Sequence, residues 1–242
     1  MKEQGREEPK IVSAAEKQMQ AWAHSSELAQ RRDQTEKSQP KMPRIGPFLT
    51  VSREKGAEGG QIAEMVAHKL GWEVLGHTLL DRIAERYRLS RPMLEVVDET
   101  KANWAHDILG TWIDQRVISH EKYITHLRYV VLAAAHCGRV VFLGRGAQFF
   151  LPAKQGLAVR IVAPEEYRIE RVTRQRNVDA KEARRIIKKA DEGRRDFVAR
   201  YFRRDIADPH LYDLVMNVAN HGPRAVADVI VELCSKFETK NG

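Results

Sequence analysis

The chain has 242 residues, 43% of them hydrophobic, which is enough for one domain with a buried core plus an appendage. A formal net charge of +8, from 41 Lys and Arg against 33 Asp and Glu, favours an anionic partner without choosing between nucleotide, nucleic acid and membrane. Residues 1–10 are charged, and no run of about 18 apolar residues occurs, so we expect neither a secretory signal nor a membrane-spanning helix. The two cysteines have no metal-type spacing, and we expect a soluble cytoplasmic protein.

Residues 1–44 differ in composition from the rest, being rich in Glu, Gln, Lys, Ser and Arg. Ser13 is followed three residues later by a glutamate, the spacing of a capping box, which predicts a helix over about 14–32. Prolines between 40 and 47 then mark a linker. We expect the folded domain over 45–242. The helix before it is either a frayed part of a solvated tail or a segment that docks on a protein partner or on that domain.

From residue 48 onward, short apolar runs alternate with longer helical periods. The apolar runs predict five strands, over about 48–52, 73–75, 139–143, 157–162 and 212–218. The helical periods predict helices over about 59–70, 78–88, 111–136, 165–176, 180–203 and 223–237. Strands separated by helices imply parallel βαβ units, and short apolar strands are typical of a sheet covered on both faces. The sequence therefore predicts an α/β fold with a five-stranded parallel sheet and helices on both faces.

A glycine-rich turn follows the first predicted strand, and a predicted helix begins directly after it. Its glycines let the backbone turn tightly and approach a ligand, while the helix start offers free N–H groups and the positive end of the helix dipole. These features predict an anion site suited to phosphate, although a plain strand-to-helix turn is the alternative from the loop alone. The candidate binding residues are Ser52, Arg53, Lys55, Gly56, Glu58, Gly59, Gly60 and Gln61.

Further stretches continue this pattern along the chain: Val140–Ala147 (VVFLGRGA), Val159–Arg171, Asp191–Arg195 and Tyr212–Asn217. Together with the turn, which opens Val-Ser-Arg-Glu-Lys-Gly, they resemble the cytidylate kinase-like family in order and spacing over about residues 48–237. The resemblance implies a three-layer P-loop kinase-type fold with a helical lid. It also implies an ATP-dependent nucleoside monophosphate kinase that uses ATP and Mg²⁺ and accepts CMP or dCMP.

The resemblance assigns the catalytic and acceptor roles mainly to arginines, whose planar groups bind phosphate oxygens in pairs. Arg145 follows the strongest predicted strand and would contact the acceptor nucleotide. Arg194 and Arg195 would close over the phosphates as part of the lid, with Arg200 behind them. Asp191 would orient a lid arginine or touch the acceptor sugar or base.

The turn departs from a complete phosphate-binding loop, G-x-x-x-x-G-K-[ST]. Gly59 occupies the lysine position and Gln61 the Ser/Thr position, where relatives often carry Arg. The family's Asp after the second strand is replaced by residues 76–77, and nearby cations such as Arg53 and Lys55 would have to reach the phosphates instead. Two functions therefore stay open: a kinase, or a nucleotide-binding sensor or partner-binding module that has lost fast transfer.

A basic stretch over 160–204 holds 15 Lys and Arg against eight acids, and within it Gly193 is expected to interrupt the helix. Nucleic-acid binding through this stretch is the less favoured alternative, because its aromatic residues have helix-core spacing and do not interleave with the cations. The histidines show no metal-ligand spacing, so no protein-held metal is expected. Four cations of the stretch are expected to be solvated: Arg184, Arg185, Lys188 and Lys189.

Overall fold

The computed structural model describes residues 45–76 and 115–241, and the helices expected over 14–32 and 78–88 lie outside these ranges. By its contacts the chain divides into two units, one formed by 45–77 with 138–242 and the other by 1–44 with 78–137. Of the second unit the structure describes only helix α6 (Gln115–Cys137), which agrees with the predicted helix there. The domain boundary after residue 44 stays a prediction.

The first unit is built on a five-stranded sheet in the order β2-β3-β1-β4-β5, in which all neighbouring strands run parallel, as predicted. The central strand β1 is buried because β3 and β4 flank it, and Val51 is paired with Leu143 on one side and Val159 on the other. The carboxyl ends of β1 and β3 therefore meet at the same edge of the sheet, where ligands bind in open α/β folds. The strands are β1 (Phe48–Arg53), β2 (Glu73–Gly76), β3 (Val140–Leu143), β4 (Gly156–Val162) and β5 (Leu214–Asn217).

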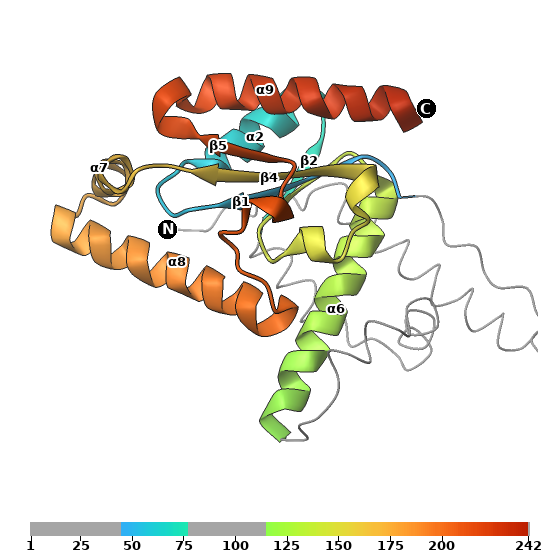
Figure 1. The fold of residues 1–242 in the computed structure, drawn as a ribbon, viewed down its shortest axis with the longest axis horizontal. Helices are drawn as coiled ribbons and strands as arrows, with labels where there is room; N and C mark the ends of the chain where they lie inside the picture. The colour runs from blue at the N-terminus through green and yellow to red at the C-terminus, as the bar shows by residue number, and fades with distance from the viewer. Residues whose placement is uncertain (1–44, 77–114, 242) are drawn as a thin grey trace, which may run out of the picture. The chain divides into compact units, whose positions relative to one another are not determined.

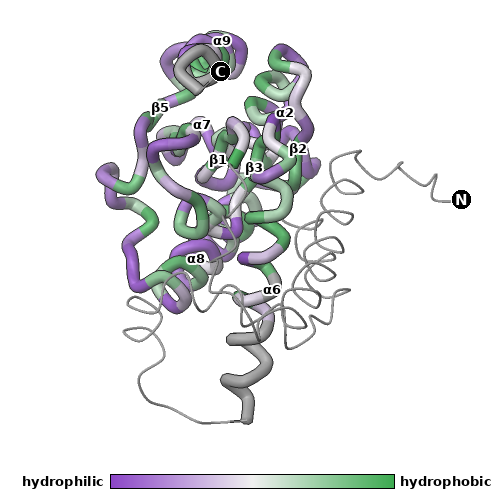
Figure 2. Tube along the Cα trace, turned by 90° about the vertical axis from the view of Figure 1, so that its right-hand side faces the viewer, coloured by the Kyte–Doolittle hydropathy of each residue, from purple (hydrophilic) through white to green (hydrophobic). Residues whose placement is uncertain are grey.

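Helices lie on both sides of this sheet (Figure 1). Helices α2 (Gly59–Leu70) and α9 (Val218–Asn241) pack together on one side, and α8 (Ala180–Phe202) lies on the other. Helix α7 (Glu165–Arg176) follows β4 and packs against α8. Ile62 and Val66 of α2 are fully buried in the core, and the hydrophobic residues gather along β1 and β3 (Figure 2). Within the described ranges, no helix is both long and apolar enough to cross a membrane.

Two helices differ from the sequence-based expectation. Helix α8 runs without interruption through Gly193, so the predicted break there is wrong. A single glycine in a helix costs about 1 kcal/mol relative to alanine, and the buried side chains of Ile187 and Val198 hold the helix on either side of it. Helix α9 contains the helix predicted from 223, but a further helical segment from Val218 precedes it across a kink at Gly222, whose φ of 74° is not helical.

Candidate functional site

The loop between β1 and α2 has a backbone shape that only particular residues allow. Gly56 has a φ of 87°, and a side chain there would meet the backbone of Arg168, since an added Cβ would lie 2.7 Å from the Arg168 carbonyl oxygen. Glu58 at the start of the helix also adopts the left-handed conformation, with φ at 56°. The loop therefore turns back on itself directly before the first turn of α2.

The first turn of α2 offers unused donors. Ile62 N is the first amide of the helix that bonds back, to the carbonyl oxygen of Glu58 at 3.0 Å. The preceding amides of Gly59, Gly60 and Gln61 have no hydrogen-bond acceptor among the residues that the structure describes. Such a helix start is a physical anion site, because the free N–H groups and the helix dipole both favour negative charge.

Two glutamates of the loop attach it to the neighbouring segments. Glu58 is almost completely buried, with 3% of its side chain exposed, and it forms an ion pair with Arg171 at 2.6 Å and accepts a hydrogen bond from the Tyr167 hydroxyl. Glu54 accepts a hydrogen bond from the Ala163 amide at 3.1 Å. Both carboxylates hold the loop in place through these partners, and Glu58 makes no side-chain hydrogen bond to the start of α2.

Asp191 ties helix α8 to the same loop. Its carboxylate accepts hydrogen bonds from the Lys55 amide at 2.8 Å and from Arg194 at 2.9 Å, and it forms an ion pair with Arg168 at 2.6 Å. Arg194 also approaches the carbonyl oxygen of Arg53, at 3.4 Å. Three segments that are distant in the sequence therefore converge at the end of β1.

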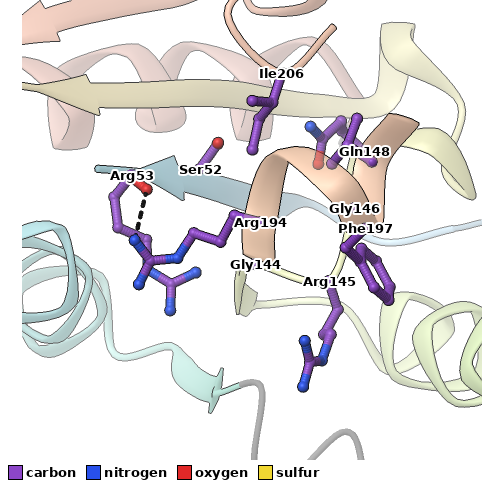
Figure 3. A pocket seen from close by; sticks show the side chains of 10 residues that line it. Ser52, Arg53, Gly144, Arg145, Gly146, Gln148, Arg194, Phe197 and Ile206 are labelled. Atoms are coloured by element: carbon purple, nitrogen blue, oxygen red, sulfur yellow. Dashed lines mark hydrogen bonds between the residues drawn. The ribbon is translucent and has the colours of Figure 1, made fainter. Parts of the chain in front are cut away.

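Arginines line an open cavity at this point (Figure 3). Arg53 and Arg194 extend side by side, and Arg145 lines the cavity from the loop after β3, apart from that pair. Burial lowers the pKa of Arg53 to about 10, and the positive charges of Arg194 and Arg145 add to this effect. Among the described residues that line this cavity there is no carboxylate, so this lining favours an anionic ligand.

A second open cavity adjoins the first, and Arg53 and Arg194 line both. Its other cations are Arg160, Arg168 and Arg195. Its two carboxylates, from Glu54 and Asp191, are both engaged by arginines. The site is thus a pair of cationic cavities with two shared arginines in the wall between them.

The model of the cytidylate kinase-like family matches residues 48–220. The chain belongs to the cytidylate kinase-like family. Its fold is similar to that of an uncharacterized protein from Eubacterium ventriosum, with a TM-score of 0.60 and 18% identity over 79% of this chain and 99% of that chain. A shikimate kinase from Acinetobacter baumannii, in complex with shikimate, aligns at a TM-score of 0.41 and 18% identity over 80% of this chain and 95% of that chain. No curated protein sequence matches the chain.

Membership of the cytidylate kinase-like family confirms the resemblance and supports a nucleotide-kinase-like protein. The expected acceptor residue Arg145 lies at the predicted edge of the sheet, with its guanidinium 5.3 Å from the centre of the Phe197 ring. Arg195 lines only the second cavity, and Arg200 lines neither and is exposed beside Tyr201. Of the three predicted lid arginines, Arg194 lines both cavities, Arg195 lines one and Arg200 lines neither.

The residues predicted to form the phosphate-binding loop differ in whether they line a cavity, are half-buried or are exposed. Ser52 lines the first cavity and accepts a hydrogen bond from Arg160 at 3.1 Å. Lys55 is half-buried, and burial lowers its pKa, with a further contribution from Arg176. Gln61 is exposed at the start of α2. The four cations expected to be solvated, Arg184, Arg185, Lys188 and Lys189, are exposed.

Sequence reasoning missed three residues of the site. Arg160 is 9% exposed at its side chain and lies within β4, and Arg168 is 14% exposed on α7. Glu54 lies between them and pairs with both, at 3.9 Å and 3.7 Å. One signal for Arg160 was available, since a charged residue within an apolar strand is rarely buried without a partner or a ligand.

Proposed function

We propose that the chain is an ATP-dependent nucleoside monophosphate kinase that transfers the γ-phosphoryl group of ATP to a CMP- or dCMP-type nucleotide in the cytoplasm. The observation that carries the proposal is the pair of adjoining cationic cavities with Arg53 and Arg194 in their common wall. Transfer between two nucleotides brings two polyanions to one point, so it requires positive charge between two neighbouring anion sites.

The proposed roles follow from position. The free amides at the start of α2 hold donor phosphates, and Arg145 holds the acceptor phosphate from the loop after β3. Arg194, which Asp191 holds in place, and Arg195 neutralise the group in transit, whereas Arg200 reaches substrate only after a movement of α8. A phosphate oxygen of the acceptor forms a bond to the γ-phosphorus of ATP. The bond between that phosphorus and the β–γ bridging oxygen breaks, and ADP leaves with its electron pair.

The residues at this site do not fit a magnesium ion held by the protein. The two carboxylates of the second cavity, from Glu54 and Asp191, already face guanidinium groups, and the Ser/Thr position of the loop is Gln61. Within the described ranges there is also no group of three potential ligands among His, Cys, Asp and Glu. Mg²⁺ would therefore arrive on the nucleotide phosphates, its common binding mode in kinases.

A nucleotide-binding module with weak or lost transfer is the second candidate. Two observations favour it: the loop lacks its lysine and its Ser/Thr, and the Lys55 amide is already bonded to Asp191. Such a module would use the helix expected over 14–32 as a contact for a protein partner. Nucleotide affinity without turnover distinguishes it from the kinase.

A coupled ADP-release assay with ATP, Mg²⁺ and a panel of nucleoside monophosphates tests the kinase. The control is Gly60→Asp compared with Gly60→Asn, two side chains of nearly equal size, since an added Cβ at Gly60 makes only an ordinary contact among the described residues, with Leu143 at 3.8 Å. The aspartate places a negative charge where the phosphates are expected, and it should abolish turnover that the asparagine variant largely retains. If no monophosphate supports turnover above the Gly60→Asp level, the kinase proposal is wrong, and absence of nucleotide binding removes both candidates.

A further inference from the structure

The stem of the Arg53 side chain lies where a side chain from residue 59 would begin. A Cβ added to Gly59 would lie 2.5 Å from Arg53 Cβ and 2.9 Å from Arg53 Cγ, closer than carbon atoms approach without a shift of one of them. Gly59 occupies the lysine position of the phosphate-binding loop. The loop lysine and Arg53 in its present position are therefore sterically exclusive.

The head of the same side chain is received by a second glycine. Gly144, with a φ of 87°, lies beside Arg53 Nη1, and a Cβ added to it would overlap that nitrogen. Arg53 thus extends from the end of β1, across Gly59, to the loop after β3, and lines both cavities along this path (Figure 3). Glycines at both ends of the side chain make room for this path.

Within residues 45–76 and 115–241, Arg53 has no direct carboxylate partner, and Asp191 acts on its charge only from a distance. Among the described residues no carboxylate forms an ion pair or hydrogen bond with its guanidinium, and Arg194 and Arg145 are close enough to lower its pKa. Burial of the Arg53 guanidinium beside two other guanidinium groups is unfavourable unless an anion joins it. The donors of Arg53 are therefore available to a ligand in a way that those of the paired Arg168 are not.

We propose that Arg53 replaces the missing loop lysine as the cation that contacts the donor polyphosphate, and that Gly59 is small because Arg53 occupies the lysine's space. The inference rests on the polyphosphate binding assumed in the proposed function. In this arrangement the positive charge at the phosphates comes from the strand before the loop, β1, and not from the helix after it, α2. Because guanidinium binds phosphate oxygens in pairs, Arg53 also contacts two oxygens where a lysine would contact one.

The test measures binding of inorganic tripolyphosphate and of ATP by calorimetry, alongside ADP release. Four variants are compared with the wild type: Arg53→Met, Arg53→Lys, Gly59→Lys and the double variant Arg53→Ala with Gly59→Lys. Arg53→Met should weaken binding about 10- to 100-fold, and Arg53→Lys should restore part of it. Gly59→Lys alone should bind poorly because its side chain overlaps Arg53, and the double variant should bind more tightly than either Arg53→Met or Gly59→Lys.

Arg184→Met serves as the control for the loss of one positive charge, since Arg184 is exposed on α8, and it should bind as the wild type does. Thermal melting of each variant separates loss of binding from loss of folding. Unchanged binding in Arg53→Met, or a double variant that binds no better than both single variants, would overturn the inference, as would a wild type that binds neither probe. A wild type that binds both probes with this pattern but releases no ADP would instead refute transfer and leave the role of Arg53 standing.

Discussion

The carboxylate of Asp191 accepts a hydrogen bond at 2.8 Å from the backbone amide of Lys55, 136 residues earlier in the chain. A protein carboxylate thereby occupies one amide of the loop that is expected to bind phosphate. The same carboxylate pairs with Arg168 and Arg194, so one side chain connects the loop to both α7 and α8.

Replacing Asp191 by Asn should lower the free energy of unfolding by about 2 kcal/mol, because the Arg168 side chain, which is only 14% exposed, loses its close charge partner. Asp196→Asn is the matched control, since Asp196 is exposed on the same helix, and its effect should stay within about 0.5 kcal/mol. Urea unfolding of the two variants gives the comparison. Equal stability of the two variants would show that Asp191 does not hold α8 to the loop.

The pair formed by Glu58 and Arg171 should show a measurable coupling in a double-mutant cycle with alanine. Because the Glu58 side chain is only 3% exposed, we expect a coupling free energy of about 1 kcal/mol or more. The pair formed by Arg174 and Glu170 on α7 is the control, since its side chains are 68% and 57% exposed, and its coupling should be about 0.3 to 0.5 kcal/mol. Chemical denaturation of both sets of variants measures this, and similar couplings would contradict the burial argument.

Two glycine-to-alanine substitutions should change the free energy of unfolding in opposite directions. Gly193→Ala should stabilise the protein by about 0.5 to 1 kcal/mol, because Gly193 lies within the uninterrupted α8 and has no atom near an added Cβ. Gly146→Ala should destabilise it by about 2 kcal/mol, because φ is 63° there and an added Cβ would overlap the Phe202 ring. Thermal melting ranks both against the wild type. A destabilising Gly193→Ala would indicate that the helix needs flexibility at that point.

Removing the charge of Arg53 should stabilise the ligand-free protein while it weakens anion binding. The pKa of Arg53 is lowered from its ordinary value to about 10, mainly by burial, so its charged form is less favourable in the folded state than in the unfolded state. Between these two values the unfolded state binds more protons, so the wild type gains stability as the pH rises through about 10. Arg53→Met should therefore be more stable than the wild type by about 1 to 2 kcal/mol at pH 8, with a smaller difference above pH 10.

Urea unfolding of Arg53→Met and the wild type at pH 8, 9 and 10.5 measures that difference, and other titrating groups contribute equally to both proteins. Arg184→Met should show no such pH-dependent difference because Arg184 is exposed. A wild type that is the more stable protein at pH 8 would show that the packing of the Arg53 stem outweighs its unfavourable charge.

The positions of the main elements were predictable because they depend on local patterns. The apolar run of β1 and the helical period of α2 both lie within a residue or so of the predicted bounds. The predicted helix break at Gly193 was wrong because the low helix propensity of glycine is a weak local effect. Burial of side chains on both sides of Gly193 overrides it.

The site was predictable in its backbone and less so in its side chains. The glycine turn and the free amides of α2 follow from a strand, a turn and a helix in succession, and Arg145 follows from the rule that parallel strands end at one edge. By contrast, neither the pairing of Glu54 with Arg160 and Arg168 nor the path of Arg53 across Gly59 is visible in the order of residues.

The sequence by itself determined the strand–turn–helix that presents bare amides, the excess of arginine and the loss of the loop lysine. Only the tertiary structure decided which of the described arginines pair directly with a carboxylate, as Arg168 does, and which, like Arg53, do not. The reason is physical: backbone conformation is set mainly by neighbouring residues, whereas the energy of a charge depends on its distance to other charges and on its burial. Both quantities arise only when segments more than a hundred residues apart come together.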